Sequence, residues 1–249
     1  MGEISMLKKI NVTVWNEAAG NQAAYPEGIH TVIANFLKGN EAIGILRTAT
    51  LNQPYHGLTP EVLEDTDVLI WWGHSFHDKV EDEIVEQVRR RILKGMGLIV
   101  LHSGHASKIF KTMLGTDTLQ LRWREADELE RVWVIEHNHP ITVGLGEYIE
   151  IPKSETYGEF FNIPVPDELI FISWFEGGEV LRSGCTFKRG NGKIFYFAPG
   201  HETHRIYDMP PIQQVIKNAV KWAAPTEYSH VSSGHHPESP ESIYKKNCV

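Results

Sequence analysis

The chain has 249 residues, of which 41% are hydrophobic and 22% charged, with 24 lysines and arginines against 32 acidic residues. This composition excludes a wholly disordered protein, and the formal net charge of −8 argues against a general nucleic-acid-binding surface. The two cysteines are too few for a disulfide framework, and no export signal or long apolar stretch is recognisable. We therefore expect a cytoplasmic protein that neither crosses nor binds membranes.

The first half of the chain alternates between β-rich and helical segments. Buried strands are predicted over residues 10–15, 42–50, 67–72 and 97–101. Helices are predicted over 25–37, from residue 59, and over 79–94, each separating two of those strands. Such strand–helix–strand repeats form parallel crossovers, so we expect these strands to run in the same direction within one sheet.

The second half contains strands without long helices between them. A helix is predicted over 106–114, followed by strands over 121–125, 131–135, 169–174, 185–188 and 193–197, and by a closing helix over 211–222. Consecutive strands without crossover helices indicate an antiparallel extension of the sheet. Residues 154–159 form a polar segment outside these predicted strands. We expect one domain over 1–224, and a polar tail over 225–249, which is rich in Ser, His, Pro and Glu.

Three of the 13 histidines lie at or just after the ends of buried strands, namely His74, His102 and His201. The carboxyl ends of parallel strands lie along one edge of a sheet, where ligands of open α/β sheets bind. We therefore expect the three imidazoles to face a common pocket. The alternative is that each histidine only completes its own turn.

Four short motifs resemble the ThuA-like (trehalose utilisation) proteins, over about residues 8 to 224. They are Trp71-Trp72-Gly73-His74, Leu101-His102-Ser103-Gly104-His105, Glu155-Thr156-Tyr157-Gly158-Glu159 and Gly200-His201-Glu202. The resemblance implies a class I glutamine amidotransferase-like fold, which is a flavodoxin-like three-layer α/β sandwich with a mostly parallel central sheet and an antiparallel extension. It also implies a role in the catabolism of trehalose-derived or other keto-disaccharides.

The amidotransferase nucleophile is absent from this sequence. Aligning the chain on Gly104-His105 places His102 where those enzymes have their catalytic cysteine. Cys185 cannot replace it, because it lies in a late strand with no helix after it. Ser103 is one position past the elbow and not in a Gly-x-Ser-x-Gly motif, which leaves a serine hydrolase as a less favoured alternative. The chain is therefore not expected to be a glutamine amidotransferase.

The candidate site combines imidazoles, carboxylates, a phenol and an indole. We assign catalytic roles to His102, His201, Glu155 and Tyr157, because imidazole and phenol groups can transfer protons next to a sugar carbonyl. Substrate-binding roles are expected for Glu17, Trp72, His74, Ser103, His105 and His204. Trp71 or Trp72 is suited to stack on a sugar face, although alternation sends neighbouring side chains to opposite faces of a strand.

Neutral imidazoles from separate strands also suit a divalent metal ion. We expect zinc or a similar ion near His30, His102 and His201, where it would activate water or polarise a sugar carbonyl. Without a metal, the same groups serve as acid and base in hydrolysis, elimination or isomerisation. The competing hypothesis is a non-catalytic sugar-binding or structural subunit. An exposed sheet edge and the tail are consistent with a homo-oligomer.

Overall fold

The computed structural model describes residues 8–18 and 23–226, with residues 235 and 237, and has a nine-stranded mixed sheet at its centre. The strands are β1 (Ile10–Asn16), β2 (Ile43–Thr50), β3 (Val68–Trp72), β4 (Gly97–Leu101), β5 (Arg122–Val134), β6 (Tyr148–Gly158), β7 (Glu168–Phe175), β8 (Val180–Arg189) and β9 (Gly192–Phe197). Their order is β2-β1-β3-β4-β9-β8-β7-β5-β6. The strands from β2 to β9 in this order are parallel, and β8, β7, β5 and β6 continue the sheet in antiparallel pairs.

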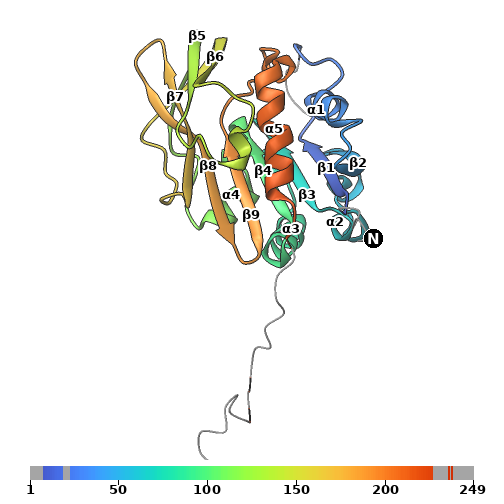
Figure 1. The fold of residues 1–249 in the computed structure, drawn as a ribbon. Helices are drawn as coiled ribbons and strands as arrows, with labels where there is room; N and C mark the ends of the chain where they lie inside the picture. Colours follow the sequence, from blue (N-terminus) through green and yellow to red (C-terminus); the bar gives the residue numbers. More distant parts are fainter. Residues whose placement is uncertain (1–7, 19–22, 227–234, 236, 238–249) are drawn as a thin grey trace, which may run out of the picture.

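Five α-helices pack on the parallel half of the sheet (Figure 1). They are α1 (Ile29–Leu37), α2 (Pro60–Glu64), α3 (Asp82–Lys94), α4 (Lys108–Leu114) and α5 (Pro210–Ala223). The buried side chains of α1 and α5 share one apolar cluster, and those of α2, α3 and α4 share a second cluster on the opposite face. The sheet is therefore covered by helices on both faces, as parallel sheets require. Among the described residues, none of these helices has the length and apolar character needed to span a bilayer.

The central strands β3 and β4 are buried along their whole length. Each is a short run of apolar residues, which is typical of a strand covered on both faces. The sequence prediction for both strands is confirmed, and so are the α/β class and the antiparallel extension. Because β3, β4 and β9 are neighbours and run in the same direction, the loops that follow them lie at one edge of the sheet.

The prediction of two short strands over 121–125 and 131–135 is wrong, because the chain forms one long strand, β5. The pairing of β5 with β6 shifts register between Arg124 and Glu128 and again between Glu128 and Glu130. Asp127 lies at this irregularity with a φ of 53°. Such bulges bend a strand without ending it, which explains why the sequence pattern is interrupted there.

Further boundaries differ from the sequence prediction, among them those of β8, which begins at Val180 instead of residue 185, and of α3, which begins at Asp82 instead of residue 79. The polar segment 154–159 largely belongs to β6, which ends at Gly158. Helix α1 begins at Ile29 instead of residue 25, because Gly28 has a φ of 83° that helical residues do not adopt. The predicted polar tail falls outside the described residues, apart from residues 225, 226, 235 and 237.

Candidate active site

Three histidines converge at the carboxyl edge of the parallel strands. His74 follows β3, His102 follows β4 and His201 follows β9. The ring centroid of His102 lies 6.3 Å from that of His74 and 5.3 Å from that of His201. The structure therefore brings these imidazoles together, as the common direction of the strands predicts.

His102 occupies a tight elbow between β4 and the short 3-10 helix His102–Ala106. Its φ of 51° is in the left-handed region, and a Cβ atom on Gly104 would come within 3.0 Å of Val100. The Nδ1 atom of His102 lies 2.9 Å from the carbonyl oxygen of Ala198, which can only accept, so Nδ1 carries the hydrogen. Its Nε2 atom faces Glu155 and Tyr157, and a histidine whose other ring nitrogen donates to a backbone carbonyl is the arrangement common among metal ligands.

Glu155 of β6 lies between His102 and His201. Its Oε2 atom is 3.1 Å from Nε2 of His102 and 3.5 Å from Nε2 of His201. Within the described chain, Glu155 Oε2 and His201 Nε2 are nevertheless buried without a partner in hydrogen-bond geometry. Buried polar atoms of folded proteins almost always have partners, so this pair of atoms requires a functional explanation.

The two histidines beside Glu155 differ in their affinity for protons. Burial disfavours the charged form of His102, but the carboxylate of Glu155 outweighs it and raises the pKa of this imidazole. Burial, reinforced by repulsion from His102, lowers the pKa of His201 to about 3. Burial alone would raise the pKa of Glu155, yet His102 and His201 hold it below its ordinary value. The arrangement favours an ionised carboxylate beside a neutral His201 imidazole.

A second carboxylate, that of Glu202, completes the histidine–glutamate cluster, which consists of His74, His102, Glu155, His201 and Glu202. The Oε1 atom of Glu202 lies 3.1 Å from Nε2 of His74. Its Oε2 atom is 3.6 Å from Nε2 of His201 and is also buried without a hydrogen-bond partner in the described chain. Glu202 directly follows His201, so the same turn supplies both residues.

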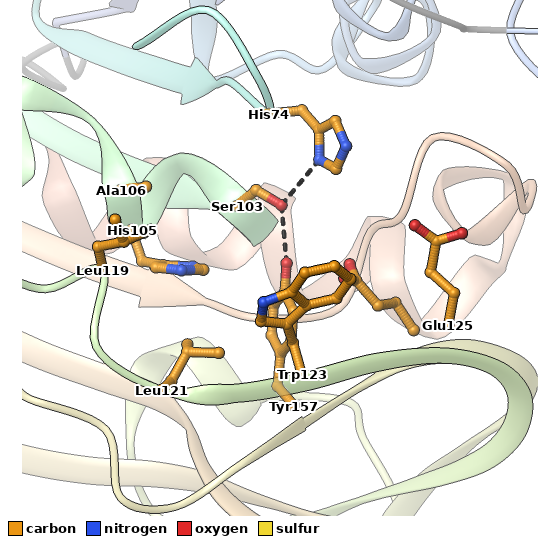
Figure 2. A pocket seen from close by; sticks show the side chains of 10 residues that line it. His74, Ser103, His105, Ala106, Leu119, Leu121, Trp123, Glu125 and Tyr157 are labelled. Carbon is orange, nitrogen blue, oxygen red and sulfur yellow. Dashed lines mark hydrogen bonds between the residues drawn. The ribbon is translucent and has the colours of Figure 1, made fainter. Parts of the chain in front are cut away.

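Tyr157 and Ser103 connect this cluster to a cavity (Figure 2). The hydroxyl groups of the two residues are 2.7 Å apart, and Ser103 Oγ is 3.1 Å from Nδ1 of His74. The Tyr157 hydroxyl also lies 3.4 Å from Nε2 of His102. Burial, together with the charge of Glu155, raises the pKa of Tyr157 well above its usual value, so this phenol keeps its proton at neutral pH.

The cavity has a volume of about 270 Å³ and is lined by His74, Ser103, His105, Ala106, Leu119, Leu121, Trp123, Glu125, Glu155 and Tyr157. His105 donates from Nδ1 to the carbonyl oxygen of His102 at 3.1 Å, and burial lowers its pKa to about 3. Its imidazole is therefore neutral. A smaller hollow of about 20 Å³ also borders Glu155 and is lined by His201 and His204, among others.

Three residues to which the sequence assigned substrate-binding roles occupy other positions. The carboxylate of Glu17 accepts hydrogen bonds from the backbone N–H groups of Ser75 and Phe76, so it holds the loop after β3. Trp72 is buried in the core and donates from Nε1 to the carbonyl oxygen of Gly200. The expectation that Trp72 offers a stacking face is wrong, because its indole has no exposed surface for a sugar. His204 pairs with Asp127 at 3.0 Å beside the smaller hollow.

Two groups of described residues have the composition and spacing of metal ligands. They are His102, Glu155 and His201, and His74, His102 and Glu202, and the ligand atoms of each group lie within 4.8 Å of one another. His30, which the sequence analysis included, is in neither group. Its Nδ1 atom is 3.1 Å from the side-chain amide of Asn16, and the third residue of the group with His102 and His201 is Glu155.

Sequence reasoning missed Trp123 and Glu202. Trp123 of β5 is paired with Tyr157 of β6, so the two side chains share one face of the strand pair. Recognising this pairing from sequence requires the register between two residues that are more than 30 positions apart in the chain. Glu202 is adjacent to His201 in a motif that drew attention to the histidine alone.

Cys185 does not provide the thiol that the elbow lacks. It lies in β8 and is fully buried, and burial raises its pKa to about 12. A thiol with so high a pKa is not a nucleophile at neutral pH. The structure is therefore consistent with the loss of amidotransferase chemistry.

Comparisons with known proteins identify the family. The family model ThuA, described as trehalose utilisation, matches residues 11–223. Comparison with curated proteins gives no sequence match. Among solved structures, a ThuA-like protein of Parabacteroides merdae is 12% identical with a TM-score of 0.67, over 89% of this chain and 93% of that one.

Other structural matches agree in fold at similarly low identity. A cytoplasmic protein of Salmonella typhimurium is 14% identical with a TM-score of 0.58, covering 87% of this chain and all of that one. A β-galactosidase of Rahnella sp. R3 is 11% identical with a TM-score of 0.54, covering 86% of this chain but only 31% of the enzyme. These likenesses show the fold alone. The family match over most of the chain shows that this protein belongs to the ThuA (trehalose utilisation) family, with a role in sugar metabolism.

Proposed function

We propose that this protein is an enzyme that acts on a keto-sugar or a glycoside at the histidine–glutamate cluster. Trehalose-derived disaccharides belong to this substrate class. The family description supports a sugar as substrate. A cavity of about 270 Å³ that opens beside buried imidazoles, carboxylates and a phenol supports catalysis in addition to binding.

We further propose that the cluster binds a divalent metal ion such as zinc through His102, Glu155 and His201. The observation that carries this proposal is that His201 Nε2 is buried without a hydrogen-bond partner in the described chain and lies 3.5 Å from Glu155 Oε2, which His102 Nε2 also approaches at 3.1 Å. Two imidazoles and one carboxylate are a ligand set that catalytic zinc uses. When bound, such an ion would polarise a sugar carbonyl or a water molecule.

The other residues of the site then have distinct roles. Tyr157 retains its proton and is placed to donate it to an oxygen of the substrate, with Ser103 fixing the orientation of the phenol. His74 is held by Glu202 on one side and by Ser103 on the other. It lines the cavity, where it would help to orient the hydroxyl groups of the substrate. Hydrolysis, elimination and isomerisation of keto-sugars all require a proton transfer that these groups can perform.

We also propose that the protein has a flavodoxin-like sandwich fold of the class I glutamine amidotransferase-like type. Its support is the order of the parallel strands, β2-β1-β3-β4-β9, which corresponds to the 2-1-3-4-5 order of flavodoxin. In such sheets, ligands bind at the carboxyl edge, which is where the cluster lies.

Metal analysis of protein purified without a histidine tag tests the proposal. The wild type should contain about one equivalent of a divalent ion, and His201→Ala and Glu155→Gln should bind it at least about tenfold more weakly. His137→Ala, which changes an exposed histidine far from the cluster, is the control and should retain the metal. Wild-type protein with no metal, and with unchanged turnover of a keto-disaccharide in the presence of chelator, would contradict the metal site.

The variant His102→Ala separates an enzyme from a binding subunit. If the cluster is catalytic, this variant should lose orders of magnitude in turnover of a keto-disaccharide while remaining folded. A change in sugar affinity alone, with no turnover in the wild type, would favour a sugar-binding subunit.

A further inference from the structure

The cavity beside the histidine–glutamate cluster has two chemically different ends. His74, Ser103, Glu155 and Tyr157 form a polar end that contacts the cluster. Leu119, Leu121 and Trp123 form an apolar end (Figure 2). We propose that this apolar end is a subsite for the non-sugar part of a glycoside, and that it selects substrates with a flat, apolar leaving group. The inference rests on the proposed action on glycosides and goes beyond it by naming the substrate class.

The position of Trp123 follows from the pairing of β5 with β6. Trp123 is directly opposite Tyr157 in the ladder, so both side chains project from the same face. The hydroxyl of Tyr157 reaches Ser103 and the cluster. Trp123 therefore lies beside Tyr157 on the same wall of the cavity, so a ligand that reaches the Tyr157 hydroxyl can also contact the indole.

The apolar end exposes large apolar side chains to solvent, although such side chains are usually buried. Trp123 is 65% exposed and Leu119 is 55% exposed, and both line the cavity. Adjacent apolar side chains that stay exposed beside a polar pocket are characteristic of ligand-binding surfaces. An aromatic or alkyl group that covered them would remove their surface from water, which favours binding.

The side chains at this end favour an apolar group over a second sugar. Leu119 and Leu121 offer no side-chain hydrogen-bond partners, so the hydroxyl groups of a sugar placed there would lose water without replacement. Trp123 can stack on either an aromatic ring or a sugar face, but the leucines discriminate between them. Glu125 also lines the cavity, but it borders the smaller hollow with Glu155 and thus belongs to the polar end.

Calorimetric binding of probes that differ in the group attached at C1 of the glucose ring tests the subsite. The probes are phenyl 1-thioglucoside, methyl 1-thioglucoside, each as both anomers, and trehalose. The phenyl compound should bind the wild type about tenfold or more tightly than the other two, because only its ring can cover the apolar end. In Trp123→Ala this preference should disappear. In the control Trp133→Ala, which removes a tryptophan that is also exposed but lies outside the cavity, it should persist.

Equal binding of trehalose and the phenyl compound, no binding of the phenyl compound, or an unchanged preference in Trp123→Ala would each overturn the inference. The variant Glu155→Gln separates this outcome from the metal proposal. It should lose the metal but keep the preference for the phenyl compound, because the apolar end is intact. Metal binding without the preference would refute the subsite alone, and the preference without metal would refute the metal site alone.

Discussion

Glu130 of β5 is a buried carboxyl group close to the candidate site. It accepts hydrogen bonds from Ser154 at 2.7 Å and from Ser173 at 2.5 Å. Burial nevertheless dominates and raises the pKa of Glu130 above its ordinary value. The folded state therefore holds this proton more tightly than the unfolded chain does.

This shift predicts a pH-dependent effect of Glu130→Gln. Below the ordinary glutamate pKa, Glu130 is protonated in both the folded and the unfolded state, so it makes no pH-dependent contribution to the free energy of unfolding. As the pH rises, the unfolded chain releases the proton first, so the wild type loses stability relative to a variant that does not ionise. Glu130→Gln should therefore gain free energy of unfolding relative to wild type as the pH rises above the ordinary glutamate pKa, until Glu130 also ionises in the folded state, as measured by urea unfolding.

The exposed Glu41 provides the comparison for this experiment. Glu41→Gln should leave the pH dependence of stability unchanged, because the carboxylate is in water in both states. An identical pH profile for Glu130→Gln and wild type would contradict the raised pKa of Glu130.

At the level of elements, the turn after β9 positions His201 and Glu202. Gly200 in this turn has a φ of 139°, and a Cβ atom there would overlap the hydroxyl of Tyr207. Only glycine meets both conditions, since other residues rarely adopt this φ and the tyrosine ring is buried. The backbone of the turn that carries His201 therefore has little freedom to change at Gly200.

Gly200→Ala should lower the free energy of unfolding by about 1–3 kcal/mol, the usual cost of overpacking a buried site. It should also weaken binding of the proposed divalent ion, because the turn that carries His201 and Glu202 must shift. Thermal unfolding and metal affinity measure the two effects. Gly146→Ala, at an exposed glycine with open space around it, should change neither. Wild-type stability of Gly200→Ala would show that the turn can relax without cost.

The accuracy of sequence prediction differs between elements for physical reasons. β3 and β4 were predictable because both are apolar runs between turn residues, and their direction placed His74 and His102 at one edge. β6 was not, because Glu155 and Tyr157 are buried in a strand that is polar in sequence. The burial of Glu155 reflects the site and not the hydrophobic core, so a hydropathy pattern cannot reveal it.

The residues of the candidate site also differ in how well the sequence predicts them. His30 is close to β1 in sequence, but its ring turns to Asn16 and away from the cluster. Trp123 enters the cavity only because β5 pairs with β6, and the bulge in β5 hides that register. Residues at the ends of parallel strands could thus be predicted, whereas those that the antiparallel extension contributes required the structure.

At the scale of the whole molecule, the antiparallel extension and the parallel half share their cores. One apolar cluster joins Val132 and Ile151 of the extension to Val14 of β1 and Ile216 of α5. On the other face, a second cluster joins residues of both halves, including Tyr157 of β6. The candidate site lies between the halves, so its geometry depends on their packing as one unit.

This shared packing predicts that the two halves unfold together. Ile151→Ala in the extension should lower the free energy of unfolding by about 2–5 kcal/mol. The α-helices of the described chain lie mainly against the parallel half, although α5 is also hydrogen-bonded through Asn218 to the segment between β5 and β6, so their circular dichroism reports chiefly on that half. Pulsed hydrogen exchange of a peptide over residues 168–175 in β7 reports on the extension. Both signals should shift to the same lower denaturant midpoint, as two-state unfolding requires.

Ile45→Ala, at an exposed position of β2, should shift neither midpoint appreciably. If the β7 peptide lost protection while the helical signal stayed at the wild-type midpoint, the extension would be an independent unit, and the site would be lost by local unfolding before the parallel half.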